Sequence, residues 1–359
     1  MISVRWLVAG WALLSAPSIC QSAEPVALLE LKIGKDVLRG RIAAHDDQTC
    51  WLLRRDGRLA SFRTDDVTDF HEIEARFRPF SSLEVRDQLQ TEFGRGFEVK
   101  TTPHYVVVAT HGTGDRYAQI FERIYRQFHT YFTTRNFKIV APEFPLVAVV
   151  FPQKQAFINY CVSEGARPQP GLVGFYLPGS NRVALYDRAA SGESSADDVD
   201  DTVIHEGTHQ VAFNTGVHSR IGQTPLWLVE GLATLFEADG IRSREIGAQP
   251  KDRANPERLD WFLEYRKLRP QKSLEQFVRD DSMFKKSPLD AYSQAWALTF
   301  YLAESRPVEF AKYLKITATR NPLKPYESEA RLQDYREAFG TDLDFIETGM
   351  LRYFDRLER

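Results

Sequence analysis

The stretch DTVIHEGTHQVAFNTG, residues 201–216, carries two histidines four positions apart, with a glutamate directly after the first. Residues four apart lie on one face of a helix, so His205 and His209 can direct both imidazoles at a single metal ion. Glu206 projects beside the same point, where a carboxylate can take a proton from metal-bound water. The stretch therefore predicts a metal-binding helix. Because this HExxH pattern also arises by chance, its surroundings decide the interpretation.

The residues around this pattern favour a helix with one buried side. Carboxylates at its expected start, Asp198, Asp200 and Asp201, complement the positive end of a helix. Residues 214–216, Asn-Thr-Gly, form a suitable stop. Apolar packing is supplied by Val203, Ile204, Val211, Ala212 and Phe213. A buried side is what an occluded ion requires.

A third ligand is expected from a second helix, because catalytic zinc usually takes three protein ligands and leaves a fourth position for water. The segment TPLWLVEGLATLFEADG, residues 224–240, places Glu230 among leucines, and Pro225 can open the helix. A carboxylate in so apolar a helix needs a partner to offset its desolvation. A metal ion provides that partner.

The paired motifs HEGTHQ and WLVEGLATLFE resemble those of the gluzincin metallopeptidases. The chain is similar in particular to peptidase MA-like proteins of the DUF1570 type, and more distantly to the M1 aminopeptidases, over roughly residues 97–310. The resemblance implies a thermolysin-like catalytic domain with His205, His209 and Glu230 as Zn²⁺ ligands and Glu206 as the catalytic carboxylate. The GAMEN motif, which anchors the substrate amine in M1 enzymes, is missing, so aminopeptidase activity does not carry over.

Two further residues are candidates for supporting roles. Glu237 lies two helical turns after Glu230 and could hold the outer N–H of a ligand histidine, or it could be a solvated glutamate near a helix end. Tyr292 lies near the position of an M1 tyrosine that donates to the developing oxyanion. The alternative for Tyr292 is a core aromatic on an amphipathic helix.

The remaining histidines carry weaker hypotheses. His218 falls in the loop between the two metal-bearing helices and could approach the cleft, although a loop histidine is more often solvated. Three others, His104, His111 and His129, have no partner at metal-ligand spacing.

The chain divides into a small β unit and a larger catalytic domain. Residues 24–78 contain short alternating apolar runs separated by turn signals such as Asp56-Gly57, which favours a small SH3-like β-barrel. Its expected role is to dock a partner. Residues 79–96 are interpreted as a connector, and residues 97–359 as the catalytic domain.

The order of elements in the larger domain predicts an α+β fold. Strands and helices alternate up to a hairpin at residues 172–187, which turns at residues 178–181, and this order favours a mixed sheet with helices on one face. From Asp197 onward nearly everything is expected to be helical. The hairpin directly precedes the metal helix, so one of its strands is expected to line the cleft and pair with an extended substrate.

Composition and the N-terminal residues limit which partners and which compartment the sequence predicts. A formal net charge of −3 over 359 residues gives no argument for nucleic acid or an anionic membrane as partner. Residues 1–23 resemble a signal peptide, which predicts export to the periplasm or the extracellular space. A lipoprotein acylated at Cys20 is a weaker alternative. No later segment approaches membrane-spanning length, and Cys50 and Cys161 could form a bridge or remain separate thiols.

The sequence thus predicts metal-assisted hydrolysis of a peptide bond, with a peptide or protein as substrate. Hydrolysis of a non-peptide amide remains open. Two alternatives without catalysis are a scaffold that keeps the metal and a chance HExxH on a structural helix. Glu206 argues against the scaffold, and Glu230 argues against the chance pattern.

Overall fold

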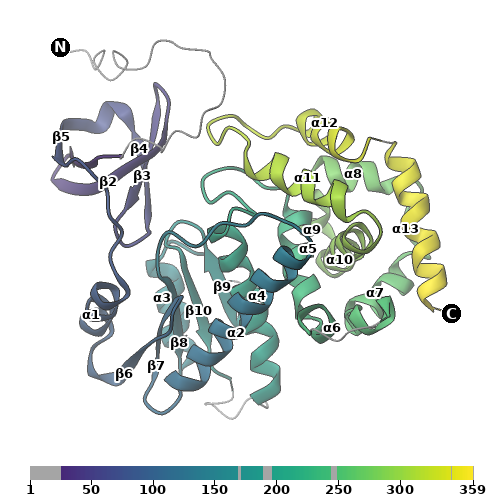
Figure 1. The fold of residues 1–359 in the computed structure, drawn as a ribbon, viewed down its shortest axis with the longest axis horizontal. Helices are drawn as coiled ribbons and strands as arrows, with labels where there is room; N and C mark the ends of the chain where they lie inside the picture. The colour runs from purple at the N-terminus through teal and green to yellow at the C-terminus, as the bar shows by residue number, and fades with distance from the viewer. Residues whose placement is uncertain (1–25, 169–170, 189–195, 244–248, 341, 359) are drawn as a thin grey trace.

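The computed structural model describes residues 26–168, 171–188, 196–243, 249–340 and 342–358, so the predicted signal peptide and Cys20 lie outside the described residues. An N-terminal sheet is followed by a second sheet with helices against it and by a helical C-terminal region (Figure 1). The expected α+β class is confirmed.

The N-terminal unit is a five-stranded antiparallel sheet in the order β4-β3-β2-β1-β5. Gly57, at φ +82°, supports the tight turn between β3 and β4, as the Asp-Gly pair predicts. In the part of the chain that the structure describes, β4 and β5 are the two edges and do not pair, so a closed SH3-like barrel is not confirmed. The strands are β1 (Leu28–Ile33), β2 (Asp36–His45), β3 (Thr49–Arg54), β4 (Leu59–Arg63) and β5 (Val67–Glu74).

The segment interpreted as a connector contains a helix, α1 (Ser82–Phe93). Its start is fixed by a capping box, in which the Ser81 backbone N–H donates to Glu84 Oε2 at 2.8 Å and the Glu84 N–H donates to Ser81 Oγ at 3.3 Å. Val85 and Leu89 are buried against the second sheet. The connector is therefore a packed element of the fold.

The second sheet is mixed, as predicted, in the order β6-β7-β8-β10-β9. The three central strands β7, β8 and β10 are parallel, while the edge strands β6 and β9 run antiparallel to their neighbours. The predicted hairpin is present and turns over residues 178–181. The strands are β6 (Phe97–Thr101), β7 (Tyr105–Thr110), β8 (Leu146–Phe151), β9 (Gly174–Leu177) and β10 (Arg182–Tyr186).

Helices cover both faces of this sheet, so the expectation of a single covered face is wrong. One face packs against α2 (Gly114–Thr134), and the other packs against α1 and α3 (Lys154–Ser163). All six residues of β8, Leu-Val-Ala-Val-Val-Phe, are buried. A continuous apolar run is typical of a strand buried on both faces, whereas a strand with one solvated face alternates.

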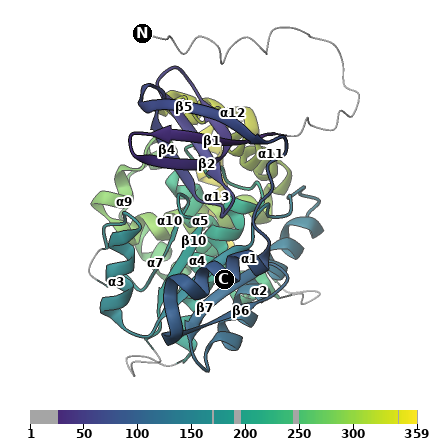
Figure 2. The same ribbon diagram turned by 90° about the vertical axis from the view of Figure 1, so that its left-hand side faces the viewer.

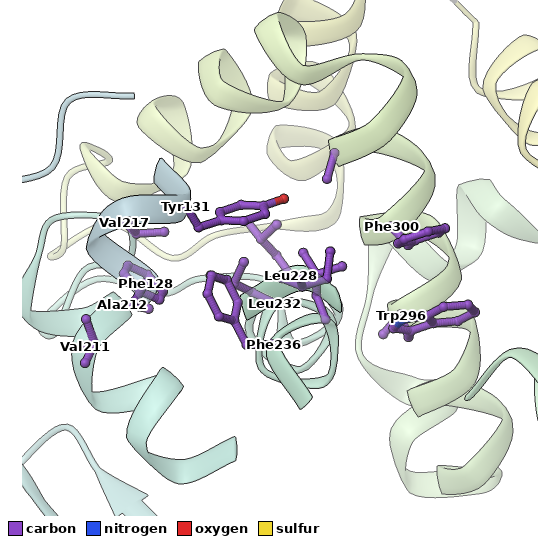
Figure 3. Close-up of a cluster of buried hydrophobic side chains, with 14 of the residues drawn as sticks. Phe128, Tyr131, Val211, Ala212, Val217, Leu228, Leu232, Phe236, Trp296 and Phe300 are labelled. Carbon is purple, nitrogen blue, oxygen red and sulfur yellow. The ribbon is translucent and has the colours of Figure 1, made fainter. Parts of the chain in front are cut away.

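The C-terminal half is helical and packs around α5 (Figure 1). Side chains from α2, α4, α5 and α10 form one core cluster, in which Phe128 of α2 stacks on Phe236 of α5 with ring centroids 5.0 Å apart (Figure 3). No helix among the described residues has the length and apolar character needed to cross a membrane. The helices are α4 (Ala196–Asn214), α5 (Leu226–Glu237), α6 (Asp239–Arg242), α7 (Pro256–Tyr265), α8 (Ser273–Arg279), α9 (Ser282–Lys286), α10 (Pro288–Ser305), α11 (Pro307–Ala318), α12 (Ser328–Phe339) and α13 (Leu343–Glu358).

The N-terminal sheet meets the larger domain at the turn between β3 and β4 (Figures 1 and 2). The Leu59 backbone N–H donates to the Gly179 carbonyl at the hairpin turn, at 2.7 Å. Arg58 makes two hydrogen bonds with the Glu164 carboxylate, at 3.0 and 3.2 Å. Phe144 of the larger domain completes the small core around Leu28. The sheet is thus bound within its own chain, and a separate docking partner stays a prediction.

Both described cysteines are free and buried in different cores, so they do not form a bridge. Cys50 lies in β3 of the N-terminal sheet, while Cys161 lies on α3. Burial raises the pKa of each thiol to about 11, which makes both poor nucleophiles near neutral pH.

Candidate metal centre

Helix α4, which carries both histidines, is held against the second sheet and against α2. The Gln210 side chain is fully buried and donates to the carbonyl oxygens of Val147, at 3.0 Å, and Asn181, at 2.8 Å. A Cβ at Gly207 would lie 3.0 Å from Ile124 Cδ1 of α2, so glycine permits this approach. These contacts fix the direction in which the histidines point.

Helix α5, which carries Glu230, is fixed at its start by a carboxylate from a distant loop. The Leu226 N–H donates to Asp281 Oδ1 at 3.0 Å, and Arg331 holds the same carboxylate with two hydrogen bonds of 2.9 Å. A negative group at a helix start satisfies free N–H groups and complements the helix dipole. Leu228, Leu232 and Phe236 of α5 are buried in the core (Figure 3), while Glu230 of the same helix faces the histidines of α4.

The three predicted ligands converge on one point. His205 Nε2 and His209 Nε2 are 3.1 Å apart, and Glu230 Oε2 lies 3.3 Å from the first and 3.6 Å from the second. Among the described residues these three form the group whose ligand atoms lie close enough to hold one ion. Two helices separated in the sequence by a loop thus present three donor atoms as a triangle.

The protonation pattern leaves lone pairs directed into this triangle. His205 Nδ1 and Glu237 Oε1 are 2.8 Å apart, so the ring carries its proton at Nδ1 and donates it to the carboxylate. The Nε2 lone pair then faces His209 and Glu230. Glu230 Oε2 is buried and accepts no hydrogen bond from the described residues. A bound cation would satisfy such a cluster of lone pairs.

Electrostatics at the triangle favour positive charge. Burial alone would lower the pKa of His205, but the neighbouring carboxylates of Glu230 and Glu237 outweigh it and raise that pKa well above the usual range. Burial alone would raise the pKa of Glu230, but the two imidazoles lower it below the usual range. Both shifts have the direction expected of a site that stabilises a cation.

Glu206 lies beside the triangle, between α4 and the edge strand β9. A Cβ at Gly174 of β9 would lie 3.0 Å from Glu206 Cγ and 2.8 Å from Thr202 Cγ2, so the strand needs glycine there to approach the helix. The backbone N–H of Tyr176 interacts with the Glu206 carboxylate. Burial, the largest influence, raises the pKa of Glu206 above its usual value.

Glu237 and Tyr292 both reach the same site. The Glu237 side chain is only 14% exposed, so it is not a solvated glutamate, and its second oxygen accepts a hydrogen bond from Asn255 at 2.9 Å. Tyr292 of α10 packs edge-on against Phe284. Burial, followed by the charges of Glu230 and Glu206, raises the pKa of the Tyr292 phenol above its usual value.

The other histidines do not join the triangle. His218 is buried rather than solvated and lies against the Phe213 ring, and burial lowers its pKa to about 3, so it is neutral. His104 pairs with Glu122 at 2.9 Å and stacks on Tyr125, while His111 faces the Arg95 carbonyl oxygen. His129 lies near the ring of Tyr125.

Two residues near the site were missed by the sequence interpretation: Asn255, which precedes α7, and Arg258, in its first turn. Asn255 followed by Pro256 is a readable helix start, and its side chain does accept the Arg258 N–H at 3.2 Å. Nothing in that local pattern indicates that the Asn255 amide also reaches Glu237. This contact depends on how α7 packs beside α5.

Comparison with known proteins gives a family match over part of the chain. Residues 200–324 match the model of a family described as a protein of unknown function (DUF1570). This segment includes most of α4, all of α5 and Tyr292, and the match agrees with the resemblance drawn from the paired motifs. No curated protein matches the chain.

One solved structure with a related arrangement is the catalytic module of the metalloprotease ZmpA from Clostridium perfringens. It shares 10% sequence identity, with a TM-score of 0.37, and the alignment covers 92% of this chain and 67% of that one. A likeness this distant assigns no activity to the present chain. The similarity to M1 aminopeptidases stays a prediction.

Proposed function

We propose that this protein is a zinc-dependent metallopeptidase in which His205, His209 and Glu230 hold Zn²⁺ and Glu206 is the general base. The observation that carries the proposal is the triangle of two imidazole nitrogens and one carboxylate oxygen, with sides of 3.1, 3.3 and 3.6 Å. The neighbouring buried carboxylate, Glu206, turns a metal site into a candidate catalytic site.

Zinc fits this donor set better than other common ions. Zinc–nitrogen and zinc–oxygen bonds of about 2.0–2.1 Å in a tetrahedron imply ligand atoms about 3.3–3.4 Å apart, and the three observed separations bracket that value. Calcium and magnesium prefer oxygen donors, whereas two imidazoles are typical of zinc and its transition-metal neighbours. Three protein ligands leave a position for water.

Each nearby side chain has a distinct task in this proposal. Zinc, when bound, supplies Lewis acidity that lowers the pKa of its water toward about 7. Glu206 would accept a proton from the attacking water and pass it to the leaving amine. The Tyr292 hydroxyl donates to the carbonyl oxygen as negative charge develops on it. Glu237 keeps the His205 proton at Nδ1, so that Nε2 remains a donor to the metal.

A peptide substrate is favoured over other amides by the edge strand beside Glu206. Among the described strands β9 pairs with β10 alone, and the backbone of Gly174 and Tyr176 faces α4 and Glu206. An extended peptide can add to such an edge through main-chain hydrogen bonds. We expect the cleaved peptide to lie along β9, in a protein that the predicted signal peptide directs out of the cytoplasm.

The proposal is tested by metal analysis together with one substitution. The purified protein should contain about one zinc per chain, and Glu206→Gln should keep that zinc while peptide hydrolysis falls by roughly 10²–10⁴-fold, the usual contribution of a general base. A chelator added to the wild-type protein serves as the control for adventitious proteases. A metal-free protein, or full activity in the Glu206→Gln variant, would refute the proposal.

A further inference from the structure

Arg258 is a largely buried arginine whose side chain forms no hydrogen bond with any described residue. Its side chain is 20% exposed, and its Nε is buried without an acceptor. The nearest carboxylate oxygens, Glu237 Oε2 and Glu257 Oε1, are each 3.7 Å away, beyond hydrogen-bond distance. Burying a donor of a charged group without an acceptor is costly, so the placement of Arg258 Nε requires an explanation.

Two other buried arginines of this chain are saturated by carboxylates, whereas Arg269, at 4% exposure, also keeps a side-chain nitrogen without an acceptor among the described residues. Arg182, at 10% exposure, makes two hydrogen bonds to Glu92, of 2.6 and 2.9 Å. Arg331, at 11% exposure, makes two to Asp281. Near Arg258, the Glu237 carboxylate is already engaged by His205 and Asn255. Arg258 therefore keeps donors available, although Glu237 offsets part of its charge.

The guanidinium of Arg258 lies at the candidate active site. The Arg258 guanidinium carbon lies 5.9 Å from the centre of the Tyr292 ring. Arg258 also borders Glu237, which contacts the ligand His205 directly. Because an extended peptide advances about 3.3–3.6 Å per residue, a group one or two residues from the reacting carbonyl is within reach of this guanidinium.

We propose that Arg258 binds a carboxylate of the substrate next to the cleaved bond. This inference rests on the proposed peptidase function and adds a specificity to it. The planar guanidinium matches a carboxylate through two parallel hydrogen bonds, for which the terminal nitrogens Nη1 and Nη2 are not among the buried donors. The carboxylate has two sources in a peptide: its free C-terminus, or the side chain of an aspartate or glutamate.

Matched peptide pairs distinguish these sources. In one arm, peptides whose last residue lies one or two positions after the cleaved bond carry either a free C-terminus or an amide. In the other arm, all termini are blocked and Asp or Glu beside the bond is compared with Asn or Gln. One arm should show a preference in kcat/KM for the carboxylate on the order of tenfold to a hundredfold, the scale of a charge-assisted hydrogen-bond pair.

Substitutions then assign the preference to Arg258. Arg258→Gln should bring the ratio of carboxylate to amide rates close to one. Arg258→Lys should retain part of it, because an ammonium keeps the charge but not the fork geometry. Glu257→Gln, at a neighbouring side chain that is 80% exposed, should leave the ratio unchanged. Circular dichroism checks that each variant folds. If Arg258→Gln does not fold, the partial loss of the carboxylate preference in Arg258→Lys tests the role of Arg258 instead.

Two results obtained with cleaved peptides would overturn the inference. Equal wild-type rates for carboxylate and amide in both arms would exclude it while leaving the peptidase function intact. An equal loss of rate on every peptide in Arg258→Gln would mean that Arg258 only positions Glu237. If zinc-loaded wild-type protein cleaved no peptide, the proposed function itself would fail. Calorimetry with Glu206→Gln then tests Arg258 separately, and equal affinity for each pair would overturn its role.

Discussion

His205 shows how the orientation of one ligand is built from its neighbours. One ring nitrogen faces Glu230 and His209, and the other meets Glu237, whose second oxygen is held by Asn255. The chain of contacts therefore runs from a loop before α7 to the candidate ligand on α4. A partner of this kind fixes the tautomer and raises the basicity of the metal-facing nitrogen.

Removing the charge of Glu237 should weaken metal binding without removing a ligand. In Glu237→Gln we expect zinc affinity to fall on the order of tenfold to a hundredfold, because an amide no longer stabilises the Nδ1 proton of His205. Competition with a chromogenic chelator measures the change, and Glu257→Gln serves as the control. Wild-type affinity in the Glu237 variant would show that this contact does not tune the site.

The residues near the site differ in how readily the sequence predicts their positions. His205 and His209 could be predicted because helix geometry fixes the relation of residues four apart. Glu230 could be predicted because a carboxylate in an apolar helix demands a partner. Arg258 could not, because its proximity to Tyr292 depends on how α7 and α10 pack together, and no spacing along the chain encodes that contact.

At the level of elements, the position of Glu230 depends on the close packing of α5 and α10. A Cβ at Gly231 would lie 2.5 Å from the Ala295 carbonyl oxygen of α10, and closer still to Thr299 Oγ1. The backbone oxygen cannot move aside without bending α10. Glycine at this position therefore sets the distance between the helix that carries Glu230 and the helix that carries Tyr292.

Gly231→Ala should destabilise the protein even though alanine favours helices. Overpacking against backbone costs about 1–3 kcal/mol or more, while the gain in helix propensity is only about 1 kcal/mol. Gly207→Ala is the matched control, because its Cβ would meet the flexible end of Ile124 at 3.0 Å. Thermal or urea unfolding measures both variants. A Gly231→Ala protein as stable as the control would contradict the predicted clash.

The elements themselves could be predicted more readily than their packing. The hairpin of β9 and β10 and the helices α4 and α5 follow from local patterns and were predicted. Helix α1 was missed although its Ser81-x-x-Glu84 capping box was readable, because its surface is mixed in charge and shows little periodicity. The sequence interpretation missed that helices cover both faces of the second sheet. The continuous apolar run of β8 indicates burial on both faces, whereas a strand with one solvated face alternates, and this difference was not used.

At the scale of the whole molecule, the N-terminal sheet is anchored to the same structure that forms the candidate cleft. Arg220, from the loop between α4 and α5, donates to the Gly57 carbonyl oxygen at 2.6 Å and to the Pro178 carbonyl oxygen at 2.7 Å. One side chain thus links the loop between α4 and α5, the hairpin beside Glu206 and the N-terminal sheet. Cooperative unfolding of the two regions is the expected consequence.

The anchoring can be measured through Arg58 and Glu164, whose side chains are 28% and 8% exposed. A double-mutant cycle with alanine at each position should give a coupling of about 1 kcal/mol, because the pair is largely buried and doubly hydrogen-bonded. The pair Arg63 and Asp65, at 66% and 74% exposure, serves as the control, with a coupling near zero. Equal couplings for the two pairs would mean that the sheet is held by its apolar contact with Phe144 instead. In the single variants at Arg58 and Glu164 the unfolding transition should stay single but move to lower temperature, since removing one contact from a shared interface weakens both regions together.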